Sequence, residues 1–160
     1  MDYIVVKWLH ILSSTILFGA GVGSAFHLFA ASLRGHTPGA AGSARNVVLA
    51  DWMMTTPAAI MQPFTGLWLI HRLHIPASTP WVAWSLALYA VAFGCWLPVV
   101  WIQLRLRDIS AATAAASGRA PLPRAYWRLF AWWVGLGWVA FIAFVAIFWM
   151  MVARQVPFAL

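Results

Sequence analysis

The feature that most constrains this chain is the length of its stretches without an acidic or basic residue. Three such stretches run from Trp8 to Leu33, from Leu73 to Leu104 and from Leu129 to Ala153, and they contain 26, 32 and 25 residues. About 20 apolar residues in a helix cross the hydrocarbon core of a bilayer. Because that core offers the backbone no hydrogen-bond partners, such segments cross it as helices. Three membrane-spanning helices are therefore predicted.

A fourth segment, Asn46–His71, is apolar but less uniform. Residues 52–71 carry no charge and are long enough to cross the bilayer, so we predict a span here as well. A re-entrant or interfacial segment is the alternative, because several polar residues and prolines interrupt the segment: Asp51, Thr55, Thr56, Pro57, Gln62 and Pro63.

The composition agrees with a membrane protein. Hydrophobic residues make up 64% of the 160 residues and charged residues 8%, too few charges to cover the surface of a soluble domain. We predict one all-α domain over residues 1–160, a polytopic membrane protein folded as a four-transmembrane-helix antiparallel bundle. The stretches Arg34–Arg45 and Arg105–Pro123 are predicted as loops. The helices are expected at about 4–33, 46–71, 80–104 and 124–153.

The basic residues predict the orientation. The net charge of +7 does not indicate nucleic-acid binding, because no dense basic stretch is present and loops of membrane proteins collect basic residues on the cytoplasmic side. The opposite face carries only Lys7, Arg72 and Arg154. Both termini are therefore expected outside the cell. The loops that face the cytoplasm carry Arg34, Arg45, Arg105, Arg107, Arg119, Arg124 and Arg128.

Two histidines are expected at the outer face, His10 about 12 Å and His71 about 18 Å from the bilayer midplane. Two facing imidazoles on neighbouring helices can hold a haem iron inside a bundle. Gly21, three turns after His10, would leave room for a flat ring, and Lys7 and Arg72 could pair with the propionates. The alternative is that both histidines meet lipid headgroups or water.

A second polar group is expected near the cytoplasmic face. His27 and Asp51 are each about 13 Å from the midplane on their own helices. A buried carboxylate needs a partner, and His27 or Arg45 could supply it. The group is either a proton path or a structural ion pair.

Other residues give weaker signals. Trp96, Trp132, Trp133 and Trp138 lie deep in the spans and could line a flat cofactor, but ordinary packing is the favoured explanation. Gly19 and Gly23 form a GxxxG motif, which indicates close helix packing and self-association as a homo-oligomer. No catalytic triad, phosphate-binding loop or zinc spacing is present in the sequence.

Most of the chain resembles a known family. The segments MDYIVVKWLHILSSTILFGAGVGSAF, VVLADWMMTTPAAIMQPFTGLWLIH, TPWVAWSLALYAVAFGCWLPVVWIQLRLRD and PRAYWRLFAWWVGLGWVAFIAFVAIFWMMVA resemble the DUF 2269 family of predicted bacterial integral membrane proteins. That resemblance implies the bacterial cytoplasmic (inner) membrane. The tetrapeptide Lys7-Trp8-Leu9-His10 is also similar to the opening of HemJ-type and CopD-like membrane proteins, which implies a haem b at His10.

These observations suggest three functions. The leading hypothesis is a b-type haem electron-transfer protein, linked to quinone or a redox partner, with His10 and His71 as ligands of the haem iron. The second is a non-enzymatic accessory subunit of a larger membrane complex. The third is a small-solute or metal transporter that uses His27, Asp51 and Gln62.

Overall fold

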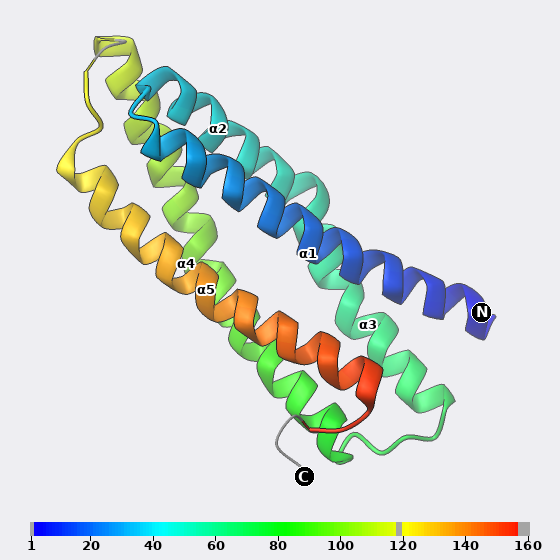
Figure 1. Cartoon of the computed structure of the whole chain (residues 1–160). Helices are drawn as coiled ribbons and strands as arrows, with labels where there is room; N and C mark the ends of the chain where they lie inside the picture. Colours follow the sequence, from blue (N-terminus) through cyan, green and yellow to red (C-terminus); the bar gives the residue numbers. More distant parts are fainter. Residues whose placement is uncertain (1, 118–119, 157–160) are drawn as a thin grey trace.

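The computed structural model of the chain describes residues 2–117 and 120–156 (Figure 1). These residues form helices and turns and contain no strand, which confirms the all-α fold class. One element, η1, is a short turn of π-helix. The elements in chain order are α1 (Tyr3–Leu33), α2 (Thr37–Ala50), η1 (Asp51–Thr55), α3 (Thr56–Arg72), α4 (Pro80–Ala116) and α5 (Arg124–Ala153).

The elements α2, η1 and α3 follow one another without a break and form a bent rod (Figure 1). The N–H of Thr56 bonds to the carbonyl of Asp51, five residues earlier. Pro57 explains this wider turn, because it has no N–H and its ring would clash with the carbonyl four residues before it in a regular α-helix. The π-turn accommodates the proline and lets the rod continue.

The helices pack as two antiparallel hairpins. The α1 helix lies along the rod, α4 lies along α5, and α2 joins the hairpins by packing against α4 (Figure 1). The α1–α2 turn, the end of α4 and the start of α5 share one end of the molecule, and the start of α1 and the end of α5 lie towards the other (Figure 1).

A hydrogen bond and a buried cluster join the hairpins at the end with the α1–α2 turn. The Tyr126 hydroxyl on α5 lies 2.7 Å from the Ser32 hydroxyl on α1, and both side chains are buried. The largest buried cluster gathers around this link: Leu28, Ala40, Ala44, Val47, Ile102, Leu106, Leu122, Tyr126, Phe130 and Trp133.

Two boundaries differ from the sequence prediction, and the first is the start of the second helix. Residues 37–45 were expected as loop but form the first part of α2. Pro38 suits the first turn of a helix, and the His36 side chain caps it by accepting a hydrogen bond of 3.1 Å from the Gly39 N–H. The small residues Ala40, Ser43 and Ala44 are buried, so they serve close packing of α2 rather than a turn.

The second difference is the end of α4, which continues to Ala116 instead of stopping at residue 104. Leu106 and Ser110, one turn apart, are fully buried, so packing extends this helix beyond the apolar run. The alanines from 111 to 116 have the highest helix propensity of all residues. By contrast, α1 and α5 begin and end within one residue of the prediction.

Three described helices, α1, α4 and α5, are long and apolar enough to cross a membrane. Large apolar side chains are exposed along the whole bundle, including Phe64 at 71% and Val152 at 86%. An apolar surface of this extent suits lipid rather than water.

Candidate functional site

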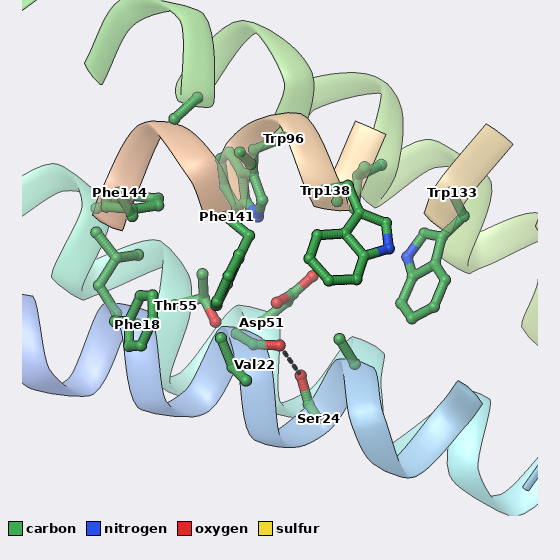
Figure 2. Close-up of a pocket in the computed structure, with 18 of the residues that line it drawn as sticks. Phe18, Val22, Ser24, Asp51, Thr55, Trp96, Trp133, Trp138, Phe141 and Phe144 are labelled. Carbon is green, nitrogen blue, oxygen red and sulfur yellow. Dashed lines mark hydrogen bonds between the residues drawn. The ribbon is translucent and has the colours of Figure 1, made fainter. Parts of the chain in front are cut away.

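A cavity of about 510 Å³ lies between the two hairpins, and we call it the central cavity (Figure 2). It is walled by α1, η1, the start of α3, α4 and α5. Its volume lies within the range of about 300–1,000 Å³ that is typical of small-molecule sites. Phe26 and Trp138 line it and are 71% and 60% exposed, so the cavity reaches the molecular surface beside α1 and α5.

Helical periodicity places the lining residues on one face of each helix. On α4 the lining positions recur every three or four residues, which is the spacing of one helical face. They are Tyr89, Ala92, Trp96, Val99 and Gln103. The α5 helix contributes a second stripe with the same spacing: Trp133, Gly137, Ala140 and Phe144.

Aromatic contacts keep the hairpins apart around the cavity. Phe18 on α1 stacks on Phe141 of α5 with 5.6 Å between ring centroids, and it meets Phe148 edge-on at 5.3 Å. The Tyr89 hydroxyl on α4 donates a hydrogen bond to the carbonyl of Ala59 on α3. Large rings therefore hold a space that small side chains would let close.

Five residues that line this cavity each carry a buried polar side-chain atom with no hydrogen-bond partner within the described part of the chain. Figure 2 shows the carboxyl of Asp51 and the side chain of Thr55 pointing into the space below the rings of Trp138 and Phe141. We call the five residues the polar cluster. Its atoms are Asp51 Oδ2, Thr55 Oγ1, Trp96 Nε1, Gln103 Oε1 and Trp133 Nε1.

The polar cluster is energetically unusual. One buried polar group without a partner costs about 1–3 kcal/mol, so native proteins contain few of them. Here every such side-chain atom of the described residues belongs to a residue that lines the same cavity. The cluster offers both hydrogen-bond donors, the two indole N–H groups, and acceptors, the carboxyl and amide oxygens. A bound molecule with matching groups would remove the penalty.

Asp51 was singled out from the sequence, but its expected partners lie elsewhere. Its side chain is 5% exposed, whereas His27 and Arg45 are exposed. Among the residues that the structure describes, the one salt bridge joins Arg107 to Asp108. The structural ion pair between Asp51 and His27 or Arg45 is therefore not formed. His27 lines a separate groove between α1 and α2.

His10 is held by α3. Its Nδ1 lies 2.8 Å from Thr65 Oγ1, and its backbone carbonyl accepts a hydrogen bond of 3.1 Å from Gln62 Nε2. A Cβ at Gly66 would lie 3.1 Å from His10 Cε1 and 3.9 Å from Nε2. The ring therefore packs edge-on against the α3 backbone, and this packing leaves no room for a porphyrin between the ring and α3.

The other residues predicted around a haem are not beside His10. His71 is exposed, and it lies nine residues after Gln62, which is about two and a half turns and hence the opposite side of α3. Lys7 and Arg72 are also exposed, and the Lys7 ammonium lies 5.8 Å from the centre of the Tyr3 ring. Gly21 lines the central cavity instead.

Sequence reasoning missed Gln103, which belongs to the polar cluster together with Asp51. Gln103 passed unnoticed because it carries no charge and ends an apolar run. The signal was its position seven residues after Trp96, which sets the two side chains on one face of α4. Of the four deep tryptophans, Trp96, Trp133 and Trp138 line the cavity, whereas Trp132 does not line it and is 66% exposed.

The described chain shows no group of three or more His, Cys, Asp or Glu residues that could hold a metal ion. The functional groups of the polar cluster are instead one carboxyl, one amide, one hydroxyl and two indole N–H groups, which lie among aromatic rings. This combination can bind a flat ligand, form hydrogen bonds to its polar edge and exchange a proton with it.

The fold and the cavity define a class, that of helical membrane proteins with a ligand-sized internal site. The chain belongs to the family described as Predicted integral membrane protein (DUF2269), whose family model matches residues 4–155. No curated protein and no solved structure matches the chain.

Proposed function

We propose that this protein binds a lipid-soluble quinone or quinol in the central cavity. The observation that carries the proposal is the polar cluster, in which residues around one aromatic cavity carry buried donors and acceptors without partners in the described chain. The ring oxygens of a quinone accept hydrogen bonds from Trp96 and Trp133. In the quinol, the hydroxyl groups also donate to Gln103 or Asp51. The ring itself stacks against the aromatic walls.

The shape of the cavity supports a ligand that arrives from the membrane. Phe26 and Trp138 flank the place where the cavity reaches the apolar surface of the bundle. A lipid-soluble ring could enter there and leave its apolar tail among the lipids. A polar, water-soluble substrate would have no such route.

Asp51 gives the site a proton-exchanging group. Reduction of a quinone takes up two electrons and two protons. The carboxyl of Asp51 can pass one of these protons to a ring oxygen and be reprotonated by water. The second proton also comes from water, and both electrons come from a separate redox partner. A lone ionised carboxylate is costly in apolar surroundings, so a neutral carboxyl that donates a hydrogen bond suits this place.

The test is a titration of the purified protein in detergent with decylubiquinone, followed by quenching of tryptophan fluorescence. The quenching should saturate. Trp133→Phe removes one donor and should weaken the affinity about three- to tenfold. Trp132→Phe is the control, because it also removes one indole but from a side chain that is 66% exposed. Quenching that never saturates, or equal affinities in the two variants, contradicts the proposal.

A lipophilic organic cation is the second candidate, in line with a transporter. The observation in its favour is that Asp51 lies among aromatic rings, with no ion pair to it in the described residues. A cation would pair with the carboxylate and the rings but leave both indole N–H groups without acceptors. Saturable binding of tetraphenylphosphonium that disappears in Asp51→Asn would favour this candidate over the quinone.

Haem ligation by His10 and His71 stays a separate prediction. Because the His10 ring packs against Thr65 and Gly66, a haem would require α1 to separate from α3. The residues around His10, as placed, do not fit a haem. A Soret band in the purified protein that is absent from His10→Ala would establish the haem, and a colourless protein after expression with ample haem would remove it.

For the membrane arrangement we propose four crossings, formed by α1, the rod α2–η1–α3, α4 and α5, in a bacterial cytoplasmic membrane. The rod has 14, 5 and 17 residues in its three parts, which is long enough for a crossing. The described arginines that were predicted to face the cytoplasm belong to the end with the α1–α2 turn. Arg119, also counted in that prediction, lies outside the described residues. This distribution supports both termini on the outside.

A further inference from the structure

A second hollow lies on the surface between α1 and α2, well apart from the polar cluster. It has a volume of about 380 Å³, and we call it the basic groove. None of its lining residues also lines the central cavity. The lining residues are His27, Ala31, Arg34, His36, Gly39, Gly42, Ser43 and Asn46.

The groups in the basic groove favour an anion. Arg34 is a permanent cation with a planar set of N–H donors that matches phosphate oxygens. His36 Nδ1 accepts the Gly39 N–H at 3.1 Å, so the proton of the neutral ring sits on Nε2 and makes that atom a donor. His27 and Asn46 add further polar groups, and no carboxylate lines the groove.

The groove also has the right depth and space for a lipid headgroup. His27 lies seven residues before Arg34 on α1, so the groove extends about 10 Å from the α1–α2 turn towards the bundle centre. The headgroup layer on one side of a bilayer is about 5–8 Å thick, which is comparable with the length of the groove. At Gly42 a Cβ would meet nothing within 4 Å, so this glycine leaves the groove open.

We propose that the basic groove binds the phosphate group of an anionic phospholipid. Basic pockets between membrane helices on the cytoplasmic side are suited to anionic headgroups. Arg34 would bind the phosphate oxygens, His36 Nε2 and His27 would donate to them, and the acyl chains would lie along the exposed apolar side chains of α1. This site stands apart from the quinone proposal, because it uses no residue of the central cavity.

The test is native mass spectrometry of the whole protein released from detergent, with added phosphatidylglycerol or phosphatidylcholine. Phosphatidylglycerol should bind preferentially, and Arg34→Gln should weaken this binding about fivefold. Arg45→Gln is the matched control, because it removes the same charge from an exposed position of α2 outside the groove. Gly42→Leu, which fills the groove without changing the charge, should weaken the binding like Arg34→Gln.

The outcomes separate the possible sources of the phosphate. If millimolar inorganic phosphate competes with the lipid, the groove still recognises phosphate, but its ligand is the free anion. No competition would assign it to the lipid. Equal binding of the two lipids, or the same loss in Arg45→Gln as in Arg34→Gln, would overturn the proposal.

Discussion

At the scale of single residues, the polar side chains inside the bundle fall into two kinds. Some are paired within the bundle, such as His10 with Thr65 and Ser32 with Tyr126. Others, those of the polar cluster, are buried without partners in the described chain. The first kind joins helices, and the second indicates a place for a ligand. A sequence shows that both kinds are polar but not which have partners.

The contact of His10 with Gly66 leads to a prediction about stability. Gly66→Ala would place a Cβ 3.1 Å from His10 Cε1, so the ring must shift by a few tenths of an ångström against its hydrogen bond to Thr65. Overpacking of this kind costs about 1–3 kcal/mol, so the thermal midpoint in detergent should fall by several degrees.

The control for this prediction is Gly94→Ala in α4, where a Cβ meets nothing within 4 Å. Alanine is the better helix former, so this variant should be as stable as the original or more so. A Gly66→Ala protein that melts no earlier than Gly94→Ala would show that His10 is not held against α3.

At the scale of elements, the π-turn η1 sets the direction of two residues of the polar cluster. Asp51 and Thr55 are its first and last residues, and both are buried. A π-turn inserts one extra residue into a helix, which rotates the residues before it relative to those after it. Such turns are frequent at functional sites, and this one aims a carboxyl and a hydroxyl into the central cavity.

Replacing Pro57, which follows the π-turn in the chain, tests the role of this turn. Pro57→Ala restores the missing N–H and removes the ring clash, so η1 should relax towards a regular α-helix and turn Asp51 away from the cavity. Decylubiquinone affinity should fall at least tenfold, while the protein stays folded by circular dichroism.

Pro63→Ala in the same rod is the comparison, because Pro63 lies inside α3 and beyond the cavity-lining residues. It should leave the affinity within about twofold. If both proline variants bind the quinone equally well, the π-turn has no part in the site.

Several elements could be predicted from the sequence and others could not. The ends of α5 were recognisable because Pro123 precedes the helix and Arg154 follows the charge-free run Leu129–Ala153. The start of α2 was missed because glycine and proline usually indicate loops, whereas here Pro38 begins the helix and small residues pack it. The π-turn has no distinct sequence signal, and so the direction of Asp51 had to come from the structure.

At the scale of the whole molecule, two hairpins tied at one end leave a cavity between them. The Asp51 carboxyl could be recognised from the sequence as an unusual charge in a span. Its grouping with Gln103 and Trp133 could not, because that requires the register of three helices against one another. The sequence suggested that Asp51 pairs with His27, but in the structure His27 lines the basic groove.

The orientation of the molecule in the membrane can be tested with its single native cysteine, Cys95, replaced by serine. In that background, Ser78→Cys lies in the α3–α4 connection and Ser117→Cys at the end of α4, and both positions are exposed. A membrane-impermeant maleimide added to intact cells should label Ser78→Cys and not Ser117→Cys. The reverse pattern would place the termini inside, and labelling of neither or both would contradict four crossings.

The central claim is that the cavity between the hairpins holds a quinone ring. The most direct measurement is photocrosslinking of the purified protein with an azido-quinone, followed by mass spectrometry of the labelled peptides. The account predicts label on residues that line the central cavity in η1, α4 and α5, and loss of that label with excess decylubiquinone. Label confined to lipid-facing side chains such as Phe64 or Val152, and unaffected by the competitor, would contradict it.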